Sequence, residues 1–183
     1  MLIRKVSVFL HATFHTQDRC SQLKLTNTIP LLIMKEYTYT DFLKEIKIYP
    51  IEVYWKHIKI IHGKVLMDND EDKRKTYKFL KDVIGGSKIS GLYLYKYQGK
   101  ILYVGKAKSI YDRTKQHFIE SIDPNPKKAF EWFSFFKKYN GELDLYFIEI
   151  NKEIDRRVIE RMLEADLSPI FETYRKDFKI SKK

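Results

Sequence analysis

Two short runs of strand-forming residues, separated by a glycine, constrain the fold of this chain more than any other stretch. The first run is Leu92–Tyr95, the second is Ile101–Val104, and Gly99 lies between them. Tyrosine, isoleucine and valine are enriched in strands, whereas glycine permits the tight turn that joins two strands. Residues 89–106 are therefore predicted to form a β-hairpin.

The length of the turn decides which side chains of this hairpin share a face. A two-residue turn at 98–99 would pair Tyr93 with Val104 and place Tyr103 on the other face, whereas a three-residue turn at 97–99 pairs Tyr93 with Tyr103. The longer turn groups the leucine-rich side chains on one face (Leu92, Leu94, Leu102 and Val104) and the tyrosines on the other (Tyr93, Tyr95, Ile101 and Tyr103). Because a half-buried sheet requires segregated faces, we predict the three-residue turn.

The hydrophobic period changes after Gly105 and predicts a helix. Ser109 is a suitable N-cap for a helix that starts at Ile110. Arg113 and His117 are four residues apart in it, so they are neighbours on one helix face. The predicted register and helix phase can bring them to the two tyrosines.

These residues together resemble the motif of a known nuclease superfamily. Gly91-Leu92-Tyr93, then Tyr103-Val104-Gly105, then Lys106, Ala107, Lys108 and Arg113, resemble the GIY-YIG endonucleases. The run from Tyr103 to Lys108 is most similar to the nuclease domain of the bacterial excision-repair incision subunit. The resemblance spans about residues 88–172 of the 183-residue chain. Two positions depart from the repair domain, which has tyrosine in place of His117 and asparagine in place of Glu172; other branches of the superfamily have histidine at the first of these.

The resemblance implies an α/β (α+β) fold in which helices flank a small three-stranded antiparallel sheet. We expect the nuclease-like domain at 87–172, a mainly helical appendage at 34–86 and a basic tail at 173–183. Residues 1–33 are an uncertain N-terminal extension with a single acidic residue, Asp18. Whether Met34 is the true start or the extension is an ordinary N-terminal arm remains open on the sequence.

Local signals divide the appendage. Thr40 can cap a helix that runs to Ile48, and Pro50 ends it. Residues 53–61 fit either a helix or a strand, because β-branched residues blur the periodicity. Asp70 can cap a further helix up to Ile84, and Gly85-Gly86 ends that helix and forms a hinge.

Two more helices and a strand are predicted beyond the motif. The segment Lys127–Tyr139 is a helix rich in aromatic residues, which we interpret as core rather than as base-stacking side chains. Residues 143–150 alternate as the third strand. Asn151 can cap a helix over 152–166, and Pro169 is expected to end regular structure.

Glu160 on the last predicted helix has two interpretations. Its neighbours Ile154, Val158, Ile159, Met162, Leu163 and Ala165 fill one apolar arc, and Glu160 falls just outside it. Taken alone, it is a solvated carboxylate paired with Arg156. The resemblance instead implies a metal-binding glutamate followed nine residues later by proline, which Glu160 and Pro169 match. Glu164 is the reserve ligand, and the expected ion is Mg²⁺ or Mn²⁺.

The resemblance also implies the catalytic roles. Tyr93 would be the general base, with Lys106 as the cation that favours its phenolate. Arg113 would bind the scissile phosphate, Tyr103 would contact the phosphate or the water network, and His117 would relay a proton or contact phosphate. Lys106, Lys108, Arg113 and Lys115 would contact DNA. Without the resemblance, these residues would be interpreted as packing, solvated or phosphate-positioning side chains.

Charge and cysteine content limit the remaining alternatives. With 35 Lys and Arg against 24 Asp and Glu, the net charge of +11 favours a polyanionic partner. The only cysteine, Cys20, excludes a disulfide within the chain and a cysteine-based zinc cluster, and fits a cytoplasmic location. No apolar run is long enough to span a bilayer. We expect a DNA partner, no membrane and no small-molecule cofactor; the alternative is a non-catalytic nucleic-acid-binding module on the same scaffold.

Overall fold

The structure, a computed structural model, describes residues 37–62, 70–122 and 126–180. These residues belong to one compact unit, Glu36–Lys183. The predicted extension at 1–33 and the choice of Met34 as the start lie outside the described residues.

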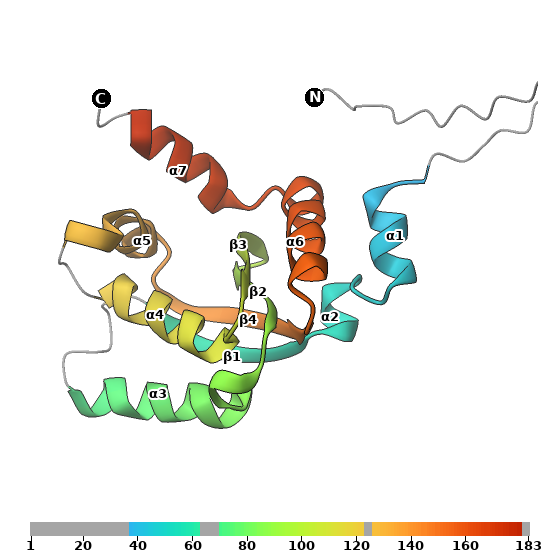
Figure 1. The fold of residues 1–183 in the computed structure, drawn as a ribbon. Helices are drawn as coiled ribbons and strands as arrows, with labels where there is room; N and C mark the ends of the chain where they lie inside the picture. The colour runs from blue at the N-terminus through green and yellow to red at the C-terminus, as the bar shows by residue number, and fades with distance from the viewer. Residues whose placement is uncertain (1–36, 63–69, 123–125, 181–183) are drawn as a thin grey trace, which may run out of the picture. The chain divides into compact units, whose positions relative to one another are not determined.

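The centre of this unit is a four-stranded antiparallel sheet (Figure 1). Its spatial order is β1-β4-β2-β3, with β1 at Lys56–His62, β4 at Gly141–Glu149, β2 at Gly91–Tyr97 and β3 at Lys100–Ala107. The prediction of three strands was wrong, because β1 pairs with β4 along its whole length. The segment 34–86 therefore supplies an edge strand to the sheet and is not a separate appendage.

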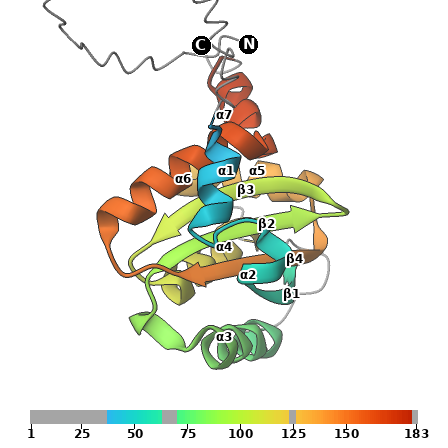
Figure 2. The ribbon, with the colours of Figure 1, turned by 90° about the vertical axis from the view of Figure 1, so that its right-hand side faces the viewer.

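Helices cover both faces of the sheet (Figures 1 and 2). One face carries Tyr93 and Tyr95 and is called the tyrosine face; the other carries Leu92 and Leu94 and is called the leucine face. The core of the tyrosine face is completed by α3 (Asp70–Ile84), α4 (Ile110–Ile122), α5 (Pro126–Lys138) and α7 (Ile170–Ile180). The core of the leucine face is completed by α1 (Tyr39–Glu45), α2 (Ile51–Tyr54) and α6 (Glu153–Leu167).

The hairpin between β2 and β3 combines features that the sequence presented as alternatives. Its turn has two residues, Gln98 and Gly99, both with positive φ, so the predicted three-residue turn is wrong. A bulge follows, because Lys96 pairs with Ile101 whereas Tyr95 pairs with Tyr103. The extra residue returns Tyr103 to the face that Tyr93 occupies.

Because of the bulge, Leu102 and Ile101 lie on the opposite faces of the sheet from those predicted. Leu102 packs in the tyrosine-face core, and Ile101 packs against the leucine-face core, the reverse of the predicted faces. Tyr93 is paired with Gly105 rather than with Tyr103. The two tyrosines are therefore diagonal neighbours.

Helix caps agree with the sequence at α4 and differ at two other helices. The amide of Asp112 donates to Ser109 Oγ at 3.1 Å, as a capping serine requires. Helix α1 is capped by Thr38, not by Thr40. At α6 the N-cap is Lys152 without a side-chain cap, so the predicted cap by Asn151 is wrong.

The chain continues as a helix beyond Pro169, where a basic tail was predicted. Helix α7 starts at Ile170, and its Phe171 is buried against Phe135 and Trp132. Proline ends the preceding helix but is compatible with a new one that starts after it. The burial of Phe135 and Phe136 confirms the interpretation of the aromatic helix as core.

Helix α6 buries a narrower stripe than the predicted arc. Ile159 and Leu163 are buried, whereas Ile154 and Val158 are 64% and 42% exposed. Arg156 is buried on the same helix. Its Nη1 donates to the Ile150 and Asn151 carbonyl oxygens at 2.8 and 2.7 Å and to Ser90 Oγ at 3.1 Å, which fixes α6 to the ends of β2 and β4.

Candidate active site

The hydroxyl groups of Tyr93 and Tyr103 meet on one side of the sheet, above Gly105. A Cβ atom built on Gly105 would lie 2.8 Å from Tyr93 Oη and 2.7 Å from Tyr103 Oη. Such distances are too short for an ordinary contact, so any side chain here would push the hydroxyls apart. The glycine after Val104 is thus required for the two phenols to converge.

Tyr93 is fully buried, and its environment makes it hard to ionise. Burial raises the pKa of the Tyr93 phenol well above its usual value, and Tyr103 and Tyr95 act in the same direction. The guanidinium of Arg113 opposes this rise. Tyr93 Oη lies 3.4 Å from His117 Nε2, which gives the phenol a neighbour that can accept its proton.

Arg113 is the cation next to the two phenols. Burial alone would lower the pKa of its guanidinium, but the interactions with Tyr93 and Tyr103 raise it above the usual value. Arg113 Nη1 also donates to Gln116 Oε1 at 2.9 Å, which holds the side chain along α4.

Lys106 does not occupy the place predicted for it. It pairs with Leu92 across the hairpin, so its side chain belongs to the leucine face, opposite to Tyr93. Its positive charge acts on Glu160 instead. The physical reason is the alternation of side chains along a strand, which separates Lys106 from a tyrosine paired with Gly105.

His117 is buried between aromatic rings and is neutral. Burial lowers the pKa of its imidazole well below the usual value, and Arg113 and His62 lower it further. The ring centroid of Trp132 lies 4.0 Å away and that of Tyr103 lies 5.6 Å away. A neutral imidazole has one bare nitrogen that can accept a proton.

Glu160 lies at the free edge of β3, the outermost strand of the sheet. Its Oε1 accepts a hydrogen bond from the Lys106 amide at 2.9 Å, so it does not extend into bulk water. Burial raises the pKa of the Glu160 carboxyl, the Lys106 amide lowers it, and Glu164 raises it again. The pairing with Arg156 that the sequence allowed does not form.

The donor set around Glu160 fits a hard divalent cation. The charge of Glu164 disfavours the ionised form of Glu160, an effect that a bound cation would relieve. Among the described residues no group of three or more His, Cys, Asp and Glu could hold a metal. Mg²⁺ commonly binds through one or two carboxylates, with substrate phosphate and water as the remaining ligands. A single anchored carboxylate is therefore compatible with it.

The other two lysines predicted to contact DNA, Lys108 and Lys115, have no hydrogen bond or ring contact with Tyr93 or Tyr103 in the described structure. Lys108 is exposed just after the end of β3. Lys115 Nζ lies 4.7 Å from the ring centroid of Tyr77 and 5.9 Å from that of Tyr111, so it packs on rings of α3 and α4.

The structure adds site residues that the sequence did not single out. Trp132 contacts the ring of His117, and His62 acts electrostatically on His117. Glu120 follows His117 by three residues on α4. The three-residue spacing of His117 and Glu120 was a readable signal. The position of His62 depends on the pairing of β1 with β4, which the sequence did not predict.

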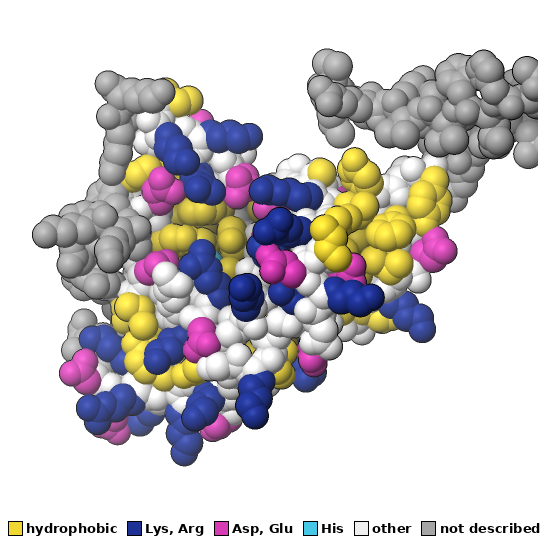
Figure 3. Space-filling view, viewed as in Figure 1, with side chains coloured by type: hydrophobic (Ala, Val, Ile, Leu, Met, Phe, Trp, Pro, Cys, Tyr) yellow, Lys and Arg dark blue, Asp and Glu magenta, His cyan; other side chains and the backbone are white. Residues whose placement is uncertain are grey.

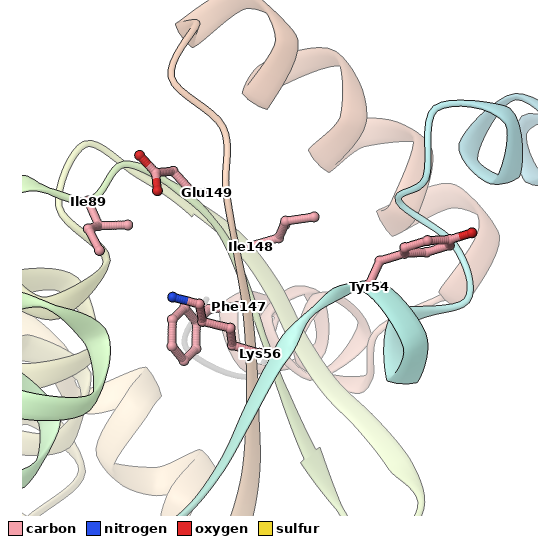
Figure 4. A pocket seen from close by; sticks show the side chains of 6 residues that line it. All are labelled: Tyr54, Lys56, Ile89, Phe147, Ile148 and Glu149. Carbon is pink, nitrogen blue, oxygen red and sulfur yellow. The ribbon is translucent and has the colours of Figure 1, made fainter.

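A small pocket elsewhere contains none of the predicted site residues (Figure 4). It lies near the end of β4 and is lined by Tyr54, Lys56, Ile89, Phe147, Ile148 and Glu149. In the part of the chain that the structure covers, we find no helix with the length and apolar character needed to cross a membrane.

Comparisons with known proteins give matches among solved structures alone. No family model matches the chain, and no curated protein matches it. Similar solved structures include the GIY-YIG N-terminal endonuclease domain of UvrC from Thermotoga maritima bound to magnesium, at 22% identity, 56% coverage of this chain, 98% coverage of that domain and a TM-score of 0.38. A point mutant of that domain, bound to its catalytic divalent cation, matches with 22% identity, 56% and 97% coverage and the same TM-score.

Proposed function

We propose that this protein is a metal-dependent DNA endonuclease that hydrolyses phosphodiester bonds. The observation that carries the proposal is the meeting of the Tyr93 and Tyr103 hydroxyls above Gly105, next to Arg113. Glu160, anchored on the Lys106 amide, lies at the open edge of the same strand, and its charge acts on Tyr103. A base, a cation and a carboxylate are the groups that this hydrolysis requires.

The base step uses Tyr93 and His117 in sequence. Tyr93 Oη takes a proton from the attacking water while its own proton passes to His117 Nε2, 3.4 Å away. This transfer is needed because a buried phenol with a raised pKa is protonated at neutral pH. His117 is uncharged and therefore offers a bare ring nitrogen to this proton; because burial makes it a weak base, the negative charge of the bound phosphate must favour its protonated form. The water then attacks phosphorus as hydroxide, and the bond to the 3′ oxygen breaks.

Arg113 and Tyr103 act on the phosphate. The guanidinium is always charged and can donate to two phosphate oxygens, where negative charge increases in the transition state. Tyr103 is less buried than Tyr93 and is influenced by both Arg113 and Glu160, so its hydroxyl is suited to donate to the phosphate between them.

Glu160 would hold the divalent cation. When bound, Mg²⁺ or Mn²⁺ supplies positive charge for the leaving oxygen. The Lys106 amide fixes Oε1 of the carboxylate and thereby orients Oε2 as the ligand oxygen. Glu164, one turn later, is the reserve ligand.

The substrate assignment rests on charge and on the motif. Lys and Arg side chains border the hydrophobic side chains that gather between α5, α7 and α6 (Figure 3). Together with the net charge of +11, they favour a phosphodiester backbone as substrate. Arg113 is the proposed DNA contact at the tyrosines, whereas Lys106, Lys108 and Lys115 would contact DNA away from them. The choice of DNA follows the resemblance to GIY-YIG nucleases.

A plasmid assay tests this function directly. Incubation of the protein with supercoiled plasmid and MgCl₂ should yield open-circular DNA, and EDTA should abolish the product. A gel-shift measurement on the same DNA runs in parallel. Retained binding without nicking, in both Mg²⁺ and Mn²⁺, would refute the enzyme and support the non-catalytic binding module.

A further inference from the structure

Near His117 lies a group of buried polar atoms without hydrogen-bond partners. Within the described parts of the chain, these atoms are His62 Nε2, Tyr95 Oη, His117 Nδ1 and Glu120 Oε2. A buried polar atom without a partner is unfavourable by about 1–3 kcal/mol. Four such atoms near one another therefore require a common explanation.

The four residues are neighbours in space although they come from three elements. The ring centroid of Tyr95 lies 5.3 Å from that of His62 and 6.0 Å from that of His117. The charge of Glu120 acts on Tyr95, and His62 acts on His117. Strands β1 and β2 and helix α4 thus bring the four side chains together, and the place where their unpartnered atoms lie is called the polar space.

The tautomer of His62 follows from its other contact. Ser121 Oγ donates to the Phe118 carbonyl at 2.7 Å, so its proton is already used. It must therefore accept from His62 Nδ1, which lies 2.8 Å away. Because His62 is fully buried and neutral, its Nε2 is a bare acceptor directed at the polar space.

The carboxylate of Glu120 is also oriented by its contacts. Gln116 Nε2 donates to Glu120 Oε1 at 2.8 Å, and Gln116 Oε1 accepts from Arg113. This chain of hydrogen bonds holds Oε1 outward and leaves Oε2 as the buried, unpartnered oxygen. Glu120 therefore presents a second acceptor to the same space.

We propose that one buried water occupies this space and that Glu120 acts through it as a positioning residue for His117. A water offers two donors and two acceptors, and buried waters usually have two to four polar partners. Its donors match His62 Nε2 and Glu120 Oε2. Its acceptors match the Tyr95 hydroxyl and a proton on His117 Nδ1. The two donors and two acceptors of the water are all matched only if His117 carries its proton on Nδ1.

This tautomer deepens the proposed function, on which its catalytic meaning rests. With the proton on Nδ1, His117 Nε2 is bare and faces Tyr93 Oη. The bare nitrogen is the one that must accept the phenolic proton. In the other tautomer Nε2 carries a hydrogen and cannot take the proton from Tyr93.

The test reads the tautomer by ¹⁵N NMR of the full chain, independently of cleavage. The His117 resonance is assigned by its absence in His117→Gln. We expect the Nδ1-protonated form in the unmodified protein. Protonation on Nε2 would overturn the proposal whether or not the protein cleaves DNA.

Glu120→Gln gives the inference a second, sharper test. Gln116 keeps the new amide oxygen outward, so the amide NH₂ replaces an acceptor by a donor in the polar space. To restore the balance, the proton of His117 should move to Nε2, and plasmid nicking should fall by about tenfold or more. An unchanged tautomer in Glu120→Gln would contradict the proposal.

Asp112→Asn is the matched control. Asp112 is an exposed carboxylate on the same helix and accepts from Ser87 Oγ rather than from a site residue. Its variant should keep both the tautomer and the nicking rate; a tautomer change here would contradict a specific role for Glu120. If the unmodified protein fails to nick while the tautomers behave as expected, the proposed function fails and the positioning of His117 stands.

Discussion

At the scale of single residues, Glu160 shows how the surroundings change the meaning of a side chain. On the sequence alone it was one more carboxylate next to an arginine on a helix. In the structure Arg156 is buried elsewhere, and Glu160 accepts from the Lys106 amide. A backbone amide fixes the carboxylate without neutralising it, which leaves its charge for a cation.

Glu160→Gln separates this charge from the anchoring. The amide oxygen of glutamine can still accept from the Lys106 amide, so the free energy of unfolding should change by less than about 1 kcal/mol. Nicking should fall by at least about 10²-fold, because a neutral amide is a poor ligand for Mg²⁺. Plasmid nicking over a Mg²⁺ titration measures the effect.

Glu164→Gln is the matched comparison. Glu164 forms an ion pair with Arg161 at 2.5 Å, and we expect its loss to reduce nicking much less. If the Glu164 variant is inactive and the Glu160 variant is active, the ligand assignment is reversed.

The sequence indicated which residues converge but not how deeply they lie. Tyr93, Tyr103 and His117 lie together, but through a two-residue turn and a register shift that differ from the predicted pairing. The burial that keeps His117 neutral depends on Trp132, whose helix is distant in sequence. The direction of Lys106 depends on which residue its strand pairs with, and the register prediction was wrong.

At the scale of elements, the hairpin from β2 to β3 sets the geometry of the site. The sequence indicated a hairpin and two segregated faces, and the structure has both. It did not indicate that a two-residue turn is combined with a bulge, because Gln98 is not a residue type that strongly predicts positive φ. The sequence left β1 open between a helix and a strand, because its run of β-branched residues fits both, and it did not predict α7, because proline commonly ends regular structure.

Gly105→Ala tests whether the hairpin must leave space above this glycine. The new Cβ would meet the ends of the Tyr93 and Tyr103 side chains at 2.8 and 2.7 Å, so the hydroxyls must separate. We expect a folded protein by circular dichroism and a loss of plasmid nicking of about 10²–10³-fold, comparable to the loss of one transition-state donor.

Gly99→Ala is the comparison, because it should lower stability and leave nicking unchanged. Gly99 has φ +79 and no atom within 4 Å of a built Cβ, so alanine there strains the turn by about 1–2 kcal/mol without touching the site. Nicking per folded molecule should be unchanged. Equal activity in the Gly105 and Gly99 variants would contradict the role assigned to the space above Gly105.

At the scale of the whole molecule, the aromatic core of the tyrosine face makes stability depend on pH. His62 is buried, stacks on Phe136 at 4.2 Å between centroids, and has a pKa lowered to about 3 by burial. In the unfolded chain its pKa returns to about 6.5. The unfolded state therefore binds more protons between these values, and stability is lost as the pH falls from 6.5 toward 3.

The pH dependence of unfolding measures this effect. Each buried, neutral histidine should remove about 1.4 kcal/mol of the free energy of unfolding for each pH unit below about 6. Urea titrations at several pH values give the slope of the free energy of unfolding against pH. His62→Leu should reduce this slope by about that amount, even if the variant is less stable at pH 7. An unchanged slope would show that His62 is accessible to protons in the folded state.

The central claim is that Tyr93 is the base of a DNA-cleaving site, and Tyr93→Phe tests it most directly. Phenylalanine keeps the ring in the core and removes the hydroxyl that faces His117. The matched control is Tyr97→Phe in the same strand, where the hydroxyl contacts only the turn residue Gln98 in the described structure.

The measurement is single-turnover nicking of supercoiled plasmid in Mg²⁺, with a gel shift for binding. We predict that Tyr93→Phe binds DNA normally but cleaves at least about 10²-fold more slowly, as loss of a general base requires, while Tyr97→Phe cleaves at the rate of the unmodified protein. Cleavage by Tyr93→Phe at the rate of the unmodified protein would contradict the account.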